Sequence, residues 1–330
     1  MNNFDKDLDK NSSNFVPLSP LSFISRVKDI YPKYESLVYG NRSYTWLQTY
    51  DRCTKFASAL TKQGIGKGST VSIIAANTPE LFEAHYSIPM TGGVINTINT
   101  RLDAETIAYI LDHSDAKLLI TDTQFSPTIK KALSLYGKKI PIIDIHDDQA
   151  IFKNDEGEKI GDWTYEEFLK TGDDNFKWSL PDDEWQAISL SYTSGTTGFP
   201  KGAVLSHLGL INNANFYAKR CGVKETSSWI NIMPMFHTSG CGMVTLGCLN
   251  SSCRMILTSI FDAKVIVSLI KDFTVDIILG VPTMILALLE EQEANPTDTK
   301  SLKIISCGGA NVAPEMVIRV RENFDCKYKL

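Results

Sequence analysis

The chain has 330 residues, of which 43% are hydrophobic and 22% are charged, and its formal net charge is −5. This composition is typical of a folded globular protein and argues against global disorder. The acidic balance argues against nucleic acid or an anionic membrane as a partner, so any phosphate-bearing ligand would have to be held by local donors.

Residues 1–13 are polar, and we expect them to form a flexible tail without the apolar core of a secretory signal. The most apolar stretch, 277–289, is interrupted by Gly280 and Pro282 and is too short to span a bilayer. The seven cysteines form no CxxC pair and show no metal-type spacing with the five histidines, which favours reduced thiols. These features predict a cytoplasmic protein, and they indicate no metal-binding residue.

Strand-like and helix-like segments alternate after this tail. A T-x-x-Q capping box at Thr45 starts a helix, and a buried strand ending at Asn77 leads through Thr78 into a helix that begins at Pro79. Further strands, with a helix between them, are predicted in "GGVINTIN" and "AKLLITD". This repetition predicts right-handed crossovers and mainly parallel sheets.

The segment 146–186 breaks the alternation, and we interpret it as a surface excursion that joins two sheets, with Trp163 and Tyr165 as anchors. The triplet 171–173, Thr-Gly-Asp, imitates a nucleotide-binding motif, but its polar-loop setting gives it no functional weight. Beyond it, strands are predicted in "AISLSY", "WINIM", "RMILT", "VDIILG" and "LKIISC", with helices from about Ser206, after "PMFHTSG", at Asp262, at Pro282 and at Pro314.

The stretch "LSYTSGTTGFPKG" (190–202) directly follows one of these strands, where ligands gather in open α/β sheets. Its glycines let the backbone approach a ligand closely, its hydroxyls add donors, and Lys201 adds positive charge. Together these groups predict a cradle for a polyphosphate. The loop is not a Walker A motif, because Lys201 lies between Pro200 and Gly202 rather than before Ser or Thr. A flexible linker is the alternative, but a linker rarely continues a buried strand without a break.

The stretch "YTSGTTGFPKGAVLSH" resembles the phosphate-loop signature of the adenylate-forming superfamily, which includes acyl-CoA synthetases, luciferases and peptide-synthetase adenylation domains. The resemblance extends from about Asn14 to Leu330. It implies a layered αβαβα arrangement of two mainly parallel sheets with flanking helices, here an incomplete N-terminal AMP-binding domain over 14–330. We place its approximate subregions at 14–145 and 187–330.

The resemblance implies ATP-dependent activation of a carboxylic acid, with a fatty acid as the expected substrate, to an acyl-adenylate and then a thioester with coenzyme A. Preorganised donors around the phosphates would lower the barrier for attack of one anion on another. By resemblance, the residues that hold the β- and γ-phosphates are Thr193, Ser194, Gly195, Thr196, Thr197, Gly198 and Lys201.

Three other segments are assigned by the same resemblance. His237 would gate the pocket or orient the substrate carboxylate, with Phe236 as a wall; it is not expected to act as a general base, since the acid is already ionised near pH 7. By itself, a single loop histidine is more often structural.

The paired glycines after Cys307 could form only a tight turn. By resemblance, the nucleotide or substrate contacts there are Gly308, Gly309 and Ala310, and weaker pocket candidates are Pro282 and Thr283.

The sequence ends at "FDCKYKL", before the Tyr-Gly-x-Thr-Glu segment that the resemblance leads us to expect. By resemblance, we therefore expect the Glu that binds Mg²⁺, the ribose-binding Asp and the C-terminal lid domain with its Lys to lie outside these 330 residues. We expect the polypeptide alone to turn over negligibly, because those contributions to charge stabilisation are missing.

Three hypotheses remain open at this stage. The first is an AMP-forming acyl-CoA synthetase. The second is an acyl-AMP ligase with an acceptor other than coenzyme A, and the third is a truncated, non-catalytic protein that binds a nucleotide or an acyl group. Chain length of the substrate and oligomeric state are not readable from the sequence.

Overall fold

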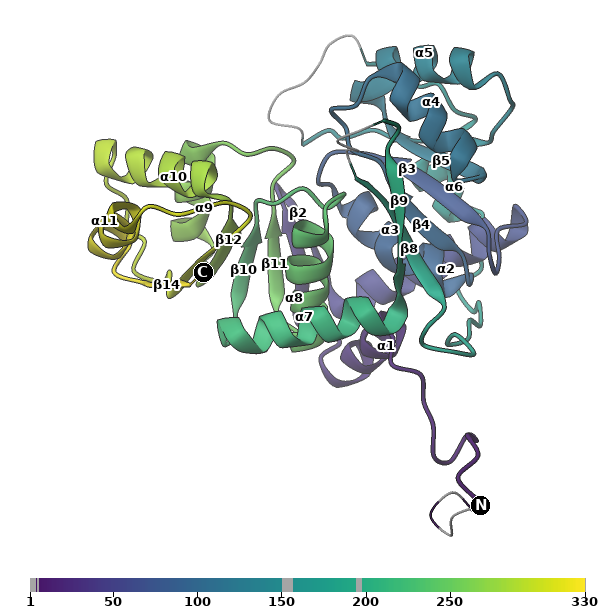
Figure 1. The fold of residues 1–330 in the computed structure, drawn as a ribbon, viewed down its shortest axis with the longest axis horizontal. Coiled ribbons are helices and arrows are strands. Elements are labelled where there is room, and N and C mark those ends of the chain that lie inside the picture. Colours follow the sequence, from purple (N-terminus) through teal and green to yellow (C-terminus); the bar gives the residue numbers. More distant parts are fainter. Residues whose placement is uncertain (1–3, 5, 150–156, 194–197, 330) are drawn as a thin grey trace.

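Two seven-stranded sheets form the framework of the chain in a computed structural model (Figure 1), which describes residues 4, 6–149, 157–193 and 198–329. The first sheet has the order β7-β6-β5-β3-β4-β8-β9, formed by Trp163–Thr164, Ile142–Ile145, Ala116–Asp122, Thr70–Ile74, Val94–Thr97, Ala187–Thr193 and Lys201–Ser206. The second has the order β14-β13-β12-β10-β11-β1-β2, formed by Lys327–Lys329, Ile304–Cys307, Ile277–Gly280, Ser228–Asn231, Arg254–Leu257, Glu35–Tyr39 and Arg42–Thr45.

Neighbouring strands run parallel except in the β1–β2 and β8–β9 hairpins at one end of each sheet. The carboxyl ends of the parallel strands within each sheet therefore lie at one edge. This confirms the expected parallel α/β topology.

Helices form three layers, one between the sheets and one on each outer face (Figure 1). One core contains residues of both sheets and of α1, α2, α3, α6, α7 and α8; α4 and α5 cover the outer face of the first sheet, and α9, α10 and α11 that of the second. This is the expected αβαβα arrangement. The helices are Pro20–Ile30, Trp46–Lys62, Pro79–Met90, Ala104–His113, Ser126–Tyr136, Tyr165–Lys170, His207–Cys221, Leu246–Ser251, Ala263–Asp272, Pro282–Ala294 and Pro314–Phe324 (α1 to α11), with the short turns Thr123–Phe125 (η2) and Ser239–Thr245 (η3, π-helical).

Several predicted helix starts agree with the structure and have a capping side chain, whereas α10 and α11 begin at Pro282 and Pro314 without one. The Thr45 hydroxyl accepts a hydrogen bond from the Gln48 amide at 3.2 Å, and the Gln48 side chain accepts one from the Thr45 amide at 2.8 Å. Asp262 likewise accepts from the Val265 amide at 2.9 Å at the start of α9. Such bonds satisfy amides that have no partner within the helix.

Six of the described strands were not anticipated from the sequence. Residues 35–45 form the β1–β2 hairpin, β6 and β7 lie at one edge of the first sheet, Lys201 begins β9 rather than a loop leading straight to α7, and 327–329 form the edge strand β14. The segment 146–186 does not join the two sheets: it contains β7, which pairs with β6, and α6, so it adds an edge to the first sheet. Trp163 and Tyr165 do pack against the core, as expected of anchors.

The central helix layer contains a buried ion pair. Arg52 on α2 lies 2.5 Å from the Glu83 carboxylate on α3, whose side chain is 2% exposed. Arg52 also pairs with Glu166 on α6 at 2.5 Å, and the Tyr165 hydroxyl donates to Glu83 at 3.0 Å. Burial raises the pKa of Glu83 to about 7 despite the opposing effect of Arg52. These contacts connect three helices of the layer.

A second buried polar contact joins α7 to α1. The His207 Nδ1 atom lies 2.8 Å from the hydroxyl of Ser19, the residue that caps α1. His207 is 4% exposed, and burial lowers its pKa from 6.5 to about 4. Below pH 6.5 the unfolded chain therefore binds a proton that the folded state excludes, so this contribution to stability is present above pH 6.5 and is lost as the pH falls toward 4.

We predict that His207→Gln weakens the pH dependence of stability. Between pH 7.5 and pH 5, the free energy of unfolding of the wild-type protein should fall by about 2 kcal/mol more than that of the variant. Urea denaturation of both proteins at the two pH values measures this difference. His146→Gln, which alters an exposed histidine, is the control and should follow the wild type. A constant offset between wild type and His207→Gln at both pH values would contradict the prediction.

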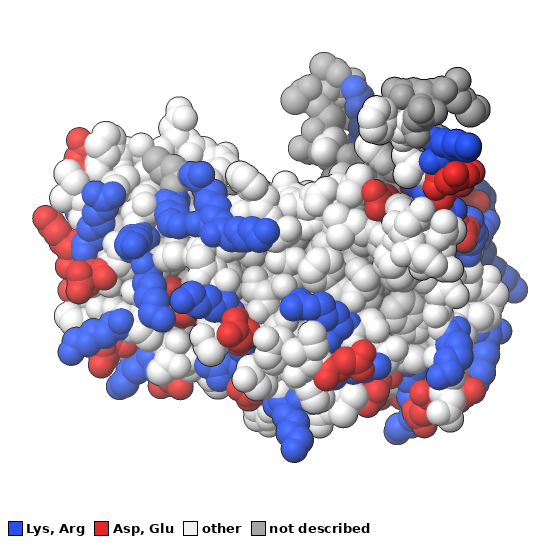
Figure 2. Space-filling model, turned by 90° about the horizontal axis from the view of Figure 1, so that it is seen from below, with Lys and Arg blue, Asp and Glu red and all other residues white. Residues whose placement is uncertain are grey.

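Charge is not evenly distributed over the surface. Seen from below, Lys and Arg side chains gather on the side of α10, α11 and β14 (Figure 2). There, the Lys329 ammonium donates to the Arg220 carbonyl, and Lys303 lies 3.4 Å from Asp276. The net charge of −5 therefore does not describe this face. Within the described part of the chain, no helix is both long and apolar enough to cross a membrane.

Candidate functional site

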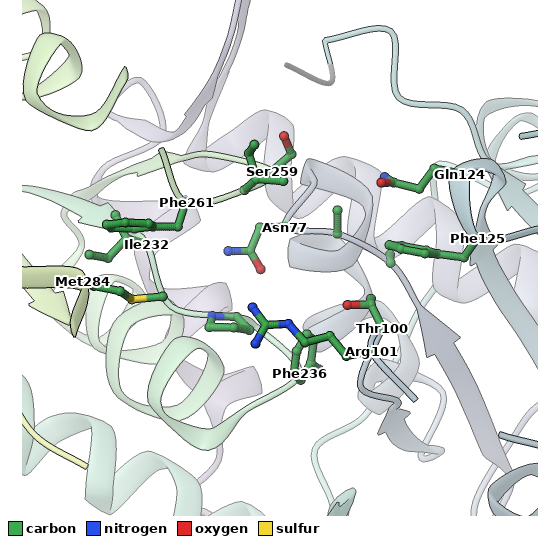
Figure 3. A pocket seen from close by; sticks show the side chains of 14 residues that line it. Asn77, Thr100, Arg101, Gln124, Phe125, Ile232, Phe236, Ser259, Phe261 and Met284 are labelled. Carbon is green, nitrogen blue, oxygen red and sulfur yellow. The ribbon is translucent and has the colours of Figure 1, made fainter. Parts of the chain in front are cut away.

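A cleft of about 440 Å³ lies at the carboxyl ends of strands from both sheets (Figure 3). One wall follows β3, β4 and β5 of the first sheet, and the other follows β10, β11 and β12 of the second. A volume of this size is typical of small-molecule sites. The lining residues are Ala75, Ala76, Asn77, Thr100, Arg101, Gln124, Phe125, Ile232, Pro234, Phe236, Ser259, Ile260, Phe261 and Met284.

Asn77 ties the two walls together. Its side-chain amide donates to the Met233 carbonyl at 3.0 Å and accepts from the Met235 amide at 2.9 Å. The sequence analysis placed Asn77 at the end of a strand, before the helix start, and in the structure Thr78 caps α3 by accepting from the Leu81 amide. The Asn77 side chain is therefore available to position the segment that carries Phe236.

Arg101 gives the cleft its positive charge. It follows β4, and its guanidinium group points into the cleft between residues of the two sheets (Figure 3). No Asp or Glu is among the lining residues, so Arg101 is the charged group among them. A guanidinium there favours an anionic ligand such as a carboxylate or phosphate. The sequence analysis did not single out Arg101, although it lies directly after a predicted strand.

His237 lies beside the cleft, next to the wall residue Phe236, with ring centroids 4.9 Å apart. Its carbonyl accepts from the Cys241 amide at 3.0 Å, at the start of the π-helical turn. Partial burial first, and the charge of Arg101 second, lower the pKa of His237 below its usual 6.5. The imidazole is therefore neutral at pH 7 and offers an N–H donor without adding charge. Phe236 itself lines the cleft, as predicted for a pocket wall.

The two flanks of the predicted phosphate loop are brought together by the β8–β9 hairpin. Thr193 pairs with Lys201 across the strands, and the Thr193 hydroxyl donates to the Lys201 carbonyl at 3.5 Å. Lys201 is exposed, and Gly198 has φ +139°, in the region that favours glycine. β8 pairs with β4, the strand that leads to Arg101. The remaining predicted loop residues, which lie outside the described part of the chain, are Ser194, Gly195, Thr196 and Thr197.

The other predicted residues lie at the same edge of the second sheet but are not among those lining the cleft. Gly308, Gly309 and Ala310 follow β13 and are exposed, with Gly309 at φ +85°. Pro282 and Thr283 begin α10 after β12. Met284, in the first turn of α10, packs against the hydrophobic core and also contributes its side chain to the cleft (Figure 3). The contacts assigned to these five residues remain predictions.

Among the described residues, no group of three or more His, Cys, Asp or Glu side chains is arranged to hold a metal ion. What the described cleft offers is one guanidinium, a neutral imidazole at its rim, amide and hydroxyl groups, and apolar walls.

Solved structures of CoA ligases share the fold. The chain aligns with an anthranilate CoA ligase, AuaEII, solved with anthranoyl-AMP, at a TM-score of 0.87 and 20% identity, covering 97% of this chain and 60% of that one. It also aligns with the N-terminal domain of FACL13 from Mycobacterium tuberculosis at a TM-score of 0.80 and 21% identity, covering 94% and 74% of the two chains.

Curated relatives are closer in sequence. An acetate–CoA ligase, CCL3, of Humulus lupulus is 43% identical over 71% of this chain and 43% of its own length. A peroxisomal acetate/butyrate–CoA ligase, AAE7, of Arabidopsis thaliana is 38% identical over 86% and 51%, and a 2-methylpropanoate–CoA ligase, CCL4, of Humulus lupulus is 34% identical over 92% and 55%. The chain thus spans about half the length of these relatives. The model of the AMP-binding enzyme family matches residues 25–330, and the chain belongs to that family.

Proposed function

We propose that this chain provides the large-domain part of an ATP-dependent acyl-CoA ligase. The observation that carries the proposal is the cleft, whose charged lining residue is Arg101 and whose neighbouring strands present Thr193 and Lys201. In the proposed reaction, a substrate carboxylate oxygen bonds to the α-phosphorus of ATP, and the bond from that phosphorus to the bridging oxygen breaks to release pyrophosphate. The coenzyme A sulfur then bonds to the acyl carbon, and AMP leaves.

Each described side chain has a role that its environment supports. Lys201 would neutralise charge on the departing pyrophosphate, and Arg101 would attract and orient the anionic groups that enter the cleft. His237 would donate a hydrogen bond to the carboxylate while remaining neutral. Mg²⁺, when bound, would add charge neutralisation at the phosphates.

We propose a short-chain acid as the substrate. Three relatives that are 43%, 38% and 34% identical to this chain are named for acetate, acetate/butyrate and 2-methylpropanoate. The fatty acid expected from the sequence remains untested, and so does the prediction that residues 1–330 alone turn over negligibly. A cytoplasmic location also remains a proposal, since one relative is described as peroxisomal.

Nucleotide binding tests the proposal. Isothermal titration of the purified chain with ATP should show saturable binding, and Lys201→Ala should weaken it about 10- to 150-fold, because a hydrogen bond to a charged group contributes roughly 1.5–3 kcal/mol. Lys300→Ala, at an exposed lysine after α10, is the matched control and should bind as the wild type does. Absence of ATP binding by the wild-type chain, or equal binding by both variants, would overturn the assignment.

A second assay identifies the substrate acid and the acceptor of the acyl group. It uses a version of the protein as long as the relatives. ATP–pyrophosphate exchange that depends on acetate, butyrate or 2-methylpropanoate would identify the acid. Thioester formation that requires coenzyme A would exclude an acyl-AMP ligase with another acceptor.

A further inference from the structure

Helix α4 carries two aromatic side chains that contact the two flanks of the phosphate loop. Tyr109 and His113 lie one turn apart, on the same face of the helix, with ring centroids 5.3 Å apart. Tyr109 stacks on Phe199, with centroids 4.7 Å apart and an interplanar angle of 25°. The His113 Nδ1 atom lies 2.7 Å from the Tyr192 hydroxyl, and the two rings pack edge to face at 5.7 Å.

These contacts lie on opposite sides of the loop along the chain. Tyr192 precedes Thr193 at the end of β8, and Phe199 lies two residues before Lys201 at the start of β9. Phe199 is 73% exposed, so burial does little to fix its position, and the stack on Tyr109 is the ring contact that holds it. Helix α4 therefore contacts both flanks of the loop, at Tyr192 before it and at Phe199 after it.

The helix that makes these contacts is itself firmly held. Its inner face packs into the outer core of the first sheet through Ile107, Ile110 and Leu111, each at most 1% exposed. Its first turn is capped by Asp103, which accepts from the Thr106 amide at 2.8 Å. Asp103 follows the segment that places Arg101 in the cleft, so α4 connects the cleft to the loop flanks.

We propose that Tyr109 and His113 are positioning residues that hold Tyr192 and Phe199, and with them the neighbouring Thr193 and Lys201, in place for nucleotide binding. They do not touch the nucleotide; they fix the flanks from which Thr193 and Lys201 are presented. Donor groups that are already fixed lose less conformational freedom when a ligand binds, so anchored flanks favour nucleotide binding. The inference rests on the proposed function, because it assigns these residues to the binding of ATP.

The expected effect of each contact is moderate. An aromatic pair or a hydrogen bond contributes enough for removal to weaken binding roughly 3- to 10-fold. Tyr109→Ala and His113→Ala should each weaken ATP binding to this extent, measured by isothermal titration of the full 330-residue chain. Tyr109→Phe should retain wild-type affinity, because it keeps the stacking ring. Glu105→Gln, at an exposed position of the same helix, is the control.

A second measurement needs no nucleotide. Amide hydrogen exchange of peptides covering 190–193 and 198–204 should be faster in Tyr109→Ala and His113→Ala than in the wild type, while peptides from α4 and α5 exchange as before. A purely structural role would instead raise exchange throughout α4 and lower the melting temperature. Unchanged exchange at the flanks would overturn the proposal.

The two measurements separate the possible failures. If the wild-type chain binds no ATP, the proposed function is contradicted, and the exchange data still decide whether Tyr109 and His113 restrain the loop. If the wild type binds ATP and both alanine variants bind it equally well, the positioning role is wrong and the proposed function stands.

Discussion

Replacing Arg52 by methionine should lower the free energy of unfolding by about 3–5 kcal/mol at pH 8, because it leaves the buried Glu83 carboxylate without its cation. The remaining Tyr165 hydroxyl is a single neutral donor and cannot compensate for that charge. Methionine has a similar length and is apolar, so the loss reports on the charge more than on a cavity. Urea denaturation at pH 8 measures the effect.

The pH dependence of the Arg52→Met variant provides an internal check. Without Arg52, the folded-state pKa of Glu83 should rise further above its unfolded value near 4.5, so destabilisation grows as the pH rises. The loss of stability should therefore be smaller at pH 6 than at pH 8.

The Arg52→Met/Glu83→Gln double variant should recover much of the lost stability. Lys55 lies on the same helix as Arg52 and forms a partly exposed ion pair with Asp174. Lys55→Met should therefore lower the free energy of unfolding by less than about 1 kcal/mol. Equal losses of stability in Arg52→Met and Lys55→Met would contradict the role assigned to the Arg52–Glu83 pair.

Replacing Asn77 by leucine should cost about 2–4 kcal/mol of stability, because the Met233 carbonyl and the Met235 amide both lose a buried partner. The same change should weaken ATP binding to the chain, since these bonds hold the Phe236 wall against the first sheet. Urea denaturation and isothermal titration measure the two effects.

Two variants sharpen the interpretation. Asn77→Asp keeps an acceptor for the Met235 amide but loses the donor to the Met233 carbonyl, so it separates the two bonds. Asn213→Leu, at an exposed position of α7, is the matched control and should change stability by less than about 0.5 kcal/mol. If Asn77→Leu is as stable as Asn213→Leu, the bridge between the walls does not contribute as described.

The architecture could be predicted because its signals are local. Alternating strand and helix patterns gave the parallel sheets, and capping residues such as Thr45 and Asp262 gave helix starts. The β1–β2 hairpin was missed although a turn signal was present: Gly40 has φ +56° and is followed by Asn41. β9 was missed because it directly follows the glycine-rich loop and none of its residues is fully buried, so it lacks the apolar pattern of the other strands.

The cleft could be predicted only in part. Phe236, which follows a predicted strand, lines it, whereas the roles of Lys201 and His237 stay predictions. Asn77 and Arg101 were missed because their roles depend on how the two sheets are placed relative to each other across the cleft. Asn77 contacts Met233 and Met235, which come from the other sheet, and no local pattern indicates that pairing.

The pairing of β1 with β11 constrains the order in which a nascent chain can assemble. The first sheet is built from residues 70–206 and has all its strands once Ser206 has been synthesised. β1 must wait longer, because its partner β11, in which Met255 pairs with Leu37, emerges later from the ribosome. Until then one edge of the β1–β2 hairpin has no neighbouring strand, which makes it a site for chaperone binding or mispairing during translation.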